Sequence, residues 1–402
     1  MKIKKKQLLL LISCLMTVIT VVACKKDDTA MSEGEQMEMN SESDKEEDGD
    51  MEENKEENQA ESKAENKAEN KAENKEDKLE KASAQAMDQT TDAGTDDKKE
   101  EHYIKETFTS TALASAKDGS SPVKEIKIYL PPNYYTSQKS YPVVYFFHGF
   151  GDSLNLISSN QKDFDGLMVG PDQKEFIVVE VDGRRASTSQ ASFWVNSPVT
   201  GQWEDYVIDE IIPYIDQNYN TIPEVNSRGI AGFSMGGFAS LNLAFRHPDV
   251  FSCVLSLCPG LLKDGSLDKA MASWRGDSTF LTCYGQAFAP NEENEKLCDI
   301  PVLDGTPVDN EIVKKWYTGF GDLEEKIEAY LSKEQPLKAI HIIYGTSDYY
   351  KWIPEGCINF SELLTEKEVD HTLTDIQSGH NIPMDYAKNF FVPFFSKNLA
   401  SD

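Results

Sequence analysis

The pentapeptide Gly232-Phe233-Ser234-Met235-Gly236 restricts the possible folds of this chain more than any other segment. A short apolar run, residues 227–231, precedes it, and a stretch rich in helix formers, residues 237–246, follows it. This order predicts a strand that passes through a tight turn into a helix, with the serine hydroxyl exposed on the turn. Glycines suit the flanks because strand and helix come too close there for larger side chains.

Around this turn the sequence alternates between apolar runs and helical patterns. Strands are predicted at 123–130, 142–147, 176–181, 251–257, 339–344 and 371–376. The run 123–130 is followed by two prolines and suits an edge strand, whereas the central runs carry apolar residues on both faces, which is typical of parallel strands in a sheet covered on both sides. We therefore predict an α/β domain over residues 102–402, with a mostly parallel sheet and helices on both faces.

Two parts of this domain need separate predictions. Residues 203–219 read as one helix that Pro213 kinks or divides. Between about residues 262 and 335 the pattern loosens into a lid-like insertion rich in tryptophan, tyrosine and phenylalanine. These aromatic side chains either line a pocket or pack on one another, and the sequence leaves both possibilities open.

The first 24 residues have the pattern of an export signal. A lysine-rich start is followed by an apolar stretch, 7–22, and the tetrad Val21-Val22-Ala23-Cys24 closes it. A basic start, a short apolar segment and a small residue before the cut are typical of a secretory signal. The tetrad resembles a bacterial lipobox, which implies lipidation of Cys24 and a domain held on the outer face of the membrane. An ordinary signal peptide or an uncleaved anchor is the alternative, and it also places the domain outside the cytoplasm.

Residues 25–101 are predicted to be a disordered acidic linker. The segment holds 12 lysines against 28 acidic residues, has no aromatic residue, and repeats Lys-Ala-Glu-Asn three times from Lys63 to Asn74. A chain of this composition cannot bury enough apolar surface to offset the entropy lost on ordering. As a coil it spans on the order of 50 Å. A specific acidic binding segment is the alternative.

The charge and the cysteines of the remaining domain reduce the number of functions that it could have. With the linker at −16 and the signal at +4, the domain keeps −17 of the total −29. An acidic domain repels polyanions, so we expect no nucleic-acid partner. Its five cysteines show no C-x-x-C spacing, which gives no support to a zinc or thioredoxin-type site. Outside the cell Cys283 and Cys298 are the nearest candidates for a disulfide, while Cys253 and Cys258 suit buried packing.

Three residues far apart in the sequence are predicted to meet at one edge of the sheet. Ser234 follows one strand, Asp348 follows the strand at 339–344, and His380 follows the last strand. A serine nucleophile needs a base within hydrogen-bond reach and a third group that orients the base, and the order Ser, Asp, His is that of α/β hydrolases. Asp370 and Asp375 are rival acids, but they flank the last strand. Backbone N–H groups of Met235 and Phe150 are placed to bind an oxyanion.

Further motifs give the chain a family resemblance. They are His148-Gly149-Phe150-Gly151, Asn196-Ser197-Pro198, Trp203-Glu204-Asp205-Tyr206, Ile212-Pro213-Tyr214-Ile215-Asp216 and Gly229 to Gly237. Together they resemble the putative-esterase family of α/β hydrolases, which includes feruloyl and acetyl-xylan esterases, S-formylglutathione hydrolase and the antigen 85 mycolyltransferases. The resemblance runs from about residue 104 to residue 399 and is weakest across the insertion. The segment after His380 matches only in part.

The resemblance implies an enzyme without cofactor or metal that acts on carboxylic esters through Ser234, His380 and Asp348, with Phe150 and Met235 as oxyanion donors. We expect a small-molecule or polysaccharide-linked ester as substrate, such as a feruloyl or acetyl ester. One alternative is an acyltransferase that passes the acyl group to an alcohol. The other is a surface binding module that keeps the fold without catalysis.

Overall fold

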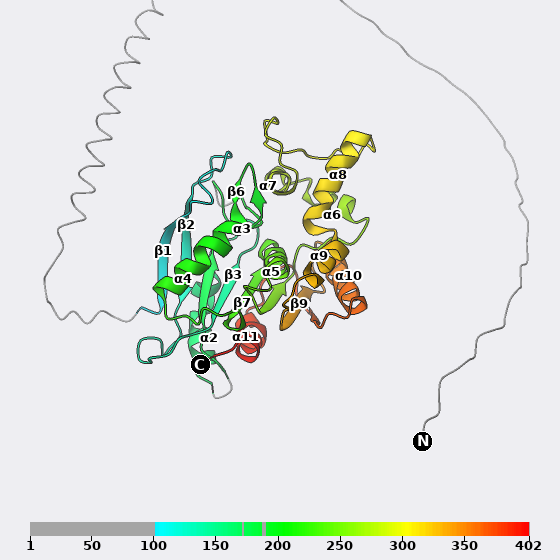
Figure 1. Ribbon diagram of the computed structural model, residues 1–402. Helices are drawn as coiled ribbons and strands as arrows, with labels where there is room; N and C mark the ends of the chain where they lie inside the picture. The colour runs from blue at the N-terminus through cyan, green and yellow to red at the C-terminus, as the bar shows by residue number, and fades with distance from the viewer. Residues whose placement is uncertain (1–100, 171–172, 187–189, 402) are drawn as a thin grey trace, which may run out of the picture. The chain divides into compact units, whose positions relative to one another are not determined.

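The computed structural model describes residues 101–170, 173–186 and 190–401 (Figure 1). The predicted signal peptide with Cys24 and all but the last residue of the predicted linker therefore lie outside the described residues. Within the described part of the chain, no helix is both long enough and apolar enough to cross a lipid bilayer.

The strands and helices alternate along the chain. The strands are β1 (Tyr103–Thr109), β2 (Val123–Tyr129), β3 (Val143–Phe147), β4 (Ile177–Val181), β5 (Asn196–Ser197), β6 (Gly201–Gln202), β7 (Arg228–Phe233), β8 (Cys253–Leu257), β9 (Ala339–Gly345) and β10 (Thr372–Ile376). The α-helices are α2 (Leu156–Met168), α3 (Trp203–Asp205), α4 (Ile212–Asn218), α5 (Met235–Arg246), α6 (Leu267–Trp274), α7 (Ser278–Phe288), α8 (Pro307–Phe320), α9 (Leu323–Leu331), α10 (Trp352–Glu366) and α11 (Val392–Asn398). Short π-helical segments η1 (Tyr206–Ile211) and η3 (Ala387–Phe391) and a 3₁₀ turn η2 (Val225–Ser227) complete the list.

Eight of the described strands form one sheet in the order β1-β2-β4-β3-β7-β8-β9-β10. The pairs from β4 to β10 are parallel, whereas β1–β2 and β2–β4 are antiparallel. The mostly parallel sheet is confirmed. The prediction of an edge strand at 123–130 is wrong, because β1 pairs along the whole of β2 and takes the edge. β1 directly follows the predicted linker, and no motif marks it.

Helices cover both faces of this sheet, which explains its apolar strands. Every residue of β3, β4, β7 and β8 is buried. Neighbouring residues of β3 point to opposite sides, because the Phe146 ring contacts Phe391 of η3 while the Phe147 ring contacts Trp194. α5 packs on β7 and β8, and α11 packs on β8 and α2.

The predicted helix at 203–219 is divided into three segments. α3 leads into the π-helical turn η1, and α4 begins with Pro213 in its first turn. The helix continues through this point, because the Ile212 N–H donates to the Val207 carbonyl in the i→i−5 pattern of η1, and Pro213 lies where the π pattern changes to the α pattern. Pro213 therefore marks a boundary, which was one of the two predicted outcomes.

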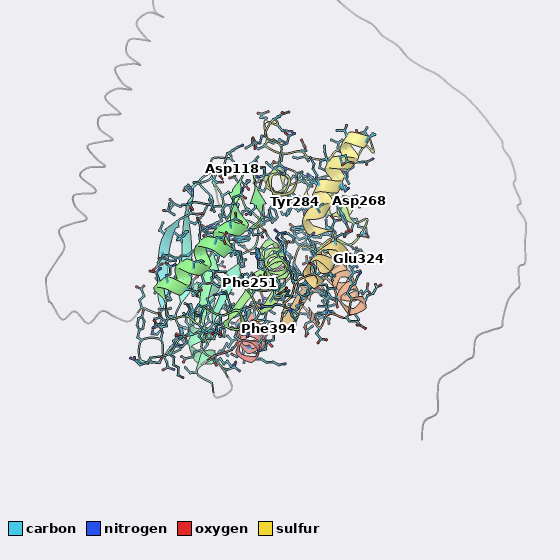
Figure 2. The ribbon with its side chains drawn as sticks, viewed as in Figure 1. Asp118, Phe251, Asp268, Tyr284, Glu324 and Phe394 are labelled. Atoms are coloured by element: carbon cyan, nitrogen blue, oxygen red, sulfur yellow. The ribbon has the colours of Figure 1, made fainter. Side chains whose placement is uncertain are left out.

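The insertion between β8 and β9 is helical rather than loose. It holds α6, α7, α8 and α9; Figure 1 shows α6, α7 and α8 at the end of the domain opposite to α2 and α11, and α9 beside α10. Tyr284 of α7 lies inside this group, with Asp268 on α6 and Glu324 on α9 (Figure 2). The Tyr284 ring is buried against Trp316, with 5.0 Å between ring centroids, so part of the aromatic content packs on itself.

The predicted disulfide between Cys283 and Cys298 is wrong for this structure, where both are buried free thiols. The Cys283 Sγ accepts a hydrogen bond from the Arg185 guanidinium at 3.0 Å, and the Cys298 thiol donates to the Thr282 carbonyl at 3.7 Å. Each sulfur thus has a different partner. Cys253 and Cys258 are fully buried, as expected for small apolar side chains.

Candidate active site

The turn at Ser234 holds its serine in a backbone conformation that L-residues rarely adopt. Ser234 has φ 56° and ψ −114° between the end of β7 and the start of α5. The turn is fixed because the Ser234 N–H donates to the Leu257 carbonyl and the Phe238 N–H donates to the Ser234 carbonyl, both at 2.9 Å. A Cβ atom at Gly236 would lie 2.0 Å from the Phe147 carbonyl oxygen, so only glycine allows this approach of helix and strand.

The structure brings Ser234, His380 and Asp348 together in one hydrogen-bonded chain. The Ser234 Oγ and the His380 Nε2 are 2.8 Å apart, and the His380 Nδ1 and the Asp348 Oδ2 are 2.7 Å apart. Asp348 follows β9 and His380 follows β10, so parallel neighbours deliver both side chains to the same edge as the serine turn. The rivals Asp370 and Asp375 are exposed, and Asp375 lies within β10.

The hydrogen bonds define which tautomer of His380 this arrangement favours. Asp348 is fully buried, and its second oxygen accepts from the Tyr350 N–H at 2.9 Å. A carboxylate without a proton only accepts, so His380 donates from Nδ1. Its Nε2 is then free to accept from the Ser234 hydroxyl, as a general base must. Sequence reasoning did not identify the Tyr350 N–H, because a backbone contact leaves no residue signature.

The predicted oxyanion donors lie beside the serine. Phe150, on the loop after β3, and Met235, the first residue of α5, line the same cavity as Ser234. In the described part of the chain neither N–H group has a protein acceptor. His148 fixes the first loop, because its Nδ1 lies 2.8 Å from the Gly149 carbonyl and its Nε2 accepts from the Gly183 N–H at 3.0 Å. Two backbone N–H groups without a protein acceptor thus belong to residues that line the cavity with the serine, as an oxyanion-binding site requires.

A cavity of about 360 Å³ opens over Ser234. Besides the serine, His380 and the two donor residues, its walls include nine aromatic or acidic side chains supplied partly by the insertion: Asp152, Phe233, Trp274, Asp277, Phe280, Phe320, Tyr349, Tyr350 and Trp352. The insertion therefore fulfils both predicted roles, since Trp274, Phe280 and Phe320 face the cavity while Tyr284 and Trp316 fill the interior. Sequence reasoning missed Asp152 and Asp277, which only the fold places here.

The described residues include one set of atoms close enough to hold a metal ion. The ligand atoms of Cys258, Asp348 and His380 all lie within 4.8 Å of one another. The Asp348 and His380 atoms of this set hydrogen bond to each other. Cys258 is buried, and burial raises the pKa of its thiol to about 12, so it is a neutral neighbour of the Asp348 carboxylate.

Comparison with known proteins agrees with the fold and with the motifs. The family model described as Putative esterase matches residues 123–348, which is more than half of the chain. The chain belongs to this esterase family. The match is narrower than the resemblance predicted for residues 104–399, and it ends at Asp348, so His380 lies beyond it. The identification of the family from its motifs is confirmed.

Individual esterases match parts of the chain. A stretch of 136 residues is 34% identical to Esterase Rv1288 of Mycobacterium tuberculosis and covers 33% of this chain and 28% of that protein. Another stretch, of 142 residues, is 31% identical to the endo-1,4-beta-xylanase/feruloyl esterase of Xylanibacter ruminicola. It covers 33% of this chain and 19% of that protein. The matched segments thus span well under two thirds of these curated relatives.

Solved structures of the esterase fold superpose on this domain. A ferulic acid esterase has a TM-score of 0.50 at 19% identity, with 74% of this chain and 98% of that chain covered. The S-formylglutathione hydrolase of Staphylococcus aureus has a TM-score of 0.50 at 12% identity over the same shares. At such identities the likeness is one of fold, and it confirms the predicted α/β-hydrolase architecture.

Proposed function

We propose that this protein is an exported serine esterase that hydrolyses carboxylic esters through an acyl-enzyme on Ser234. The observation that carries the proposal is the chain of hydrogen bonds from the Ser234 Oγ through His380 to Asp348, at 2.8 and 2.7 Å, beneath an open cavity. Membership of an esterase family supports the reaction type.

The acylation step follows from this geometry. The His380 Nε2 takes the proton of the Ser234 hydroxyl while the Oγ attacks the ester carbonyl carbon. The carbonyl oxygen becomes an oxyanion that the N–H groups of Phe150 and Met235 stabilise. Asp348 stabilises the imidazolium of His380, which then gives its proton to the leaving alcohol oxygen as the carbonyl–oxygen bond breaks. The acyl group remains on Ser234.

Deacylation repeats these steps with water. His380 takes a proton from a water molecule as the water oxygen attacks the acyl carbon. The tetrahedral oxyanion forms in the same donor pair, and His380 returns the proton to the Ser234 Oγ as that ester bond breaks. A free carboxylic acid leaves, and the serine is restored.

The cavity supports an acyl group with an aromatic ring. Trp274 and Phe280 lie 4.8 Å apart between ring centroids, and Phe280 is equally close, at 4.7 Å, to Phe150 on the oxyanion loop. Flat apolar walls beside the nucleophile favour aryl acyl groups through offset or edge-to-face contacts. Together with the feruloyl esterase among the relatives, this supports feruloyl-type esters, with acetyl esters of polysaccharide as the smaller alternative.

We place this reaction on the outer surface of the cell. The basis is the N-terminal pattern that ends in Cys24, followed by the acidic stretch to residue 101. A lipid on Cys24 would hold the domain at the membrane, and an extended linker would let it reach polymer-bound esters.

Hydrolysis of p-nitrophenyl esters of increasing acyl length and of methyl ferulate tests the proposal. We expect turnover by the wild type, its loss in Ser234→Ala, and wild-type rates in the control Ser159→Ala, whose hydroxyl lies on the exposed side of α2. Formation of a new ester when an alcohol is added would identify an acyltransferase instead. A folded wild type that neither turns over esters nor reacts with a fluorophosphonate at Ser234 would be a binding module.

A further inference from the structure

The charges around the candidate active-site cavity are all of one sign. Asp152 and Asp277 both line it, and no lysine or arginine does so among the described residues. His380 is the one basic side chain in its wall, and both of its ring nitrogens are engaged by Ser234 and Asp348. A substrate entering this cavity therefore meets carboxylates without compensating cations.

Asp152 lies on the loop that carries the predicted oxyanion donor Phe150, and it lines the same cavity. A Cβ atom on Gly149 would be 2.5 Å from the Asp152 Oδ2, so the carboxylate is packed against the oxyanion loop. Asp152 is half-buried and, within the described part of the chain, forms no salt bridge. An unpaired carboxylate here disfavours the oxyanion, because like charges repel more strongly where water is partly excluded.

Asp277 lies at the insertion side of the same cavity. One of its oxygens caps α7 by accepting from the Phe280 N–H at 2.9 Å. Asp277 is otherwise exposed, and no salt bridge involves it in the described residues. The rings of Trp274 and Phe280 line the same cavity and lie 4.8 Å apart between centroids, so Asp277 shares this wall with two aromatic side chains.

Aromatic rings and carboxylates attract the same kind of group. A ring face carries partial negative charge and binds ammonium groups, most strongly for tryptophan. Phe150, Tyr350 and Trp352 add further rings to the cavity wall. A positive group held by these rings near Asp152 and Asp277 would cancel their field at the oxyanion. The same two carboxylates would then favour the reaction instead of opposing it.

We propose that the cavity selects esters carrying a cationic ammonium group over neutral or anionic ones, with Asp152 and Asp277 as the specificity-determining residues. This inference rests on the proposed esterase function and refines its substrate class: among aryl and acetyl esters, those with an ammonium group should be hydrolysed faster than neutral ones, which include simple feruloyl esters. The ammonium group can belong to the acyl part, as in an aminoacyl ester, or to the alcohol part. The two arms of the experiment distinguish these sources.

The experiment compares charged and neutral esters of equal shape with the full chain. In one arm the charge lies in the alcohol: acetylcholine against its carbon isostere, 3,3-dimethylbutyl acetate. In the other it lies in the acyl group: the p-nitrophenyl ester of a trimethylammonio-butanoate against its tert-butyl isostere. We expect kcat/KM to be roughly 10-fold higher for the cationic member of at least one pair, as one cation–π contact and a partly exposed ion pair together imply.

Asparagine variants assign the effect to the two carboxylates. In the double variant Asp152→Asn and Asp277→Asn we expect the ratio to fall to about 2 or below, because the ring contacts alone remain. Asparagine still caps α7, so folding is kept. The control Asp249→Asn removes an exposed charge outside the cavity and should keep the wild-type ratio.

The possible outcomes distinguish failure of the charge selectivity from failure of the proposed esterase function. Equal or slower hydrolysis of the cationic member in both pairs, with serine-dependent turnover of the neutral one, would overturn the charge selectivity and leave the esterase proposal standing. A preference that survives in the double variant would equally overturn the assignment to Asp152 and Asp277. Absence of Ser234-dependent turnover of every ester would overturn both proposals.

Discussion

Asp348 shows how burial and hydrogen bonding define the task of one side chain. It is fully buried, and its two oxygens accept from the His380 ring and the Tyr350 N–H. These hydrogen bonds offset the free-energy cost of removing the carboxylate from water. They also orient the imidazole toward Ser234, so the role of Asp348 is to position and stabilise His380.

The variant Asp348→Asn should lower kcat by roughly 10³–10⁴-fold, because an amide cannot stabilise the imidazolium and favours the wrong tautomer of His380. Steady-state kinetics on a p-nitrophenyl ester, with thermal unfolding as a check on the fold, measures this. A folded variant whose kcat stays within tenfold of the wild type would contradict the assigned role.

Glu180 is a second buried carboxylate, away from Ser234. It lies on β4 and accepts from the N–H groups of Leu156 and Ile157 at the start of α2, at 2.7 and 3.3 Å. Burial raises its pKa from 4.5 to about 7 despite these bonds. Since the folded-state pKa is the higher one, this contribution to stability is present below about pH 4.5 and is lost as pH rises to about 7.

Glu180→Gln should therefore flatten the fall of the unfolding free energy between pH 5 and 8. We expect the variant to be more stable than the wild type at pH 8 by on the order of 2 kcal/mol and similar to it at pH 5. Urea unfolding at both pH values checks this. The exposed control Glu293→Gln should keep the wild-type slope, and an unchanged slope in Glu180→Gln would refute the assignment.

At the scale of elements, the turn from β7 into α5 depends on glycine. A Cβ atom at Gly236 would meet the backbone of Phe147 on β3, which cannot move without breaking the sheet. Gly236→Ala should cost roughly 3 kcal/mol or more. Gly166→Ala, in α2 where nothing lies within 4 Å of the added atom, should instead stabilise by about 0.5–1 kcal/mol. Thermal unfolding of both variants tests this contrast, which equal stabilities would contradict.

An element could be predicted from the sequence where the residue pattern within its own segment is sufficient to identify it. The largely apolar runs that became β3, β4, β7 and β8 could be predicted, because burial on both faces leaves few polar positions, such as Glu180 on β4. β1 alternates weakly, and its pairing with β2 is a tertiary property that neither segment encodes alone. The insertion helices escaped prediction because their aromatic residues pack across several helices instead of along one face.

The same distinction decides which residues of the candidate active site could be predicted from the sequence. Ser234, Asp348 and His380 could be predicted because each follows a strand, and parallel strands end at one edge. Asp152 and Asp277 could not, because only the packing of α7 over the loop after β3 brings their carboxylates to one cavity.

For the whole molecule, we propose that the N-terminal pattern ending in Cys24 sets the location of the protein, whereas the domain after residue 101 carries the esterase fold. If Cys24 carries a lipid, the wild type produced in a bacterial host should partition into the detergent phase. Cys24→Ala should appear in the aqueous fraction, because a single cysteine bears the acyl chains that bind the bilayer. The matched control is Cys14→Ala, which removes the other cysteine of the N-terminal segment and should partition as the wild type does. Equal partitioning of Cys24→Ala and the wild type would exclude the lipid anchor.

The central claim is that catalysis passes through an acyl group on Ser234, and rapid quenching with mass spectrometry tests it most directly. Mixing the full chain with a p-nitrophenyl ester and quenching in acid within one turnover should give the peptide that contains Ser234 with the mass of one added acyl group. The same peptide from His380→Ala should stay largely unmodified on this timescale. Turnover at the wild-type rate in Ser234→Ala, or an acyl group on another residue, would contradict the account.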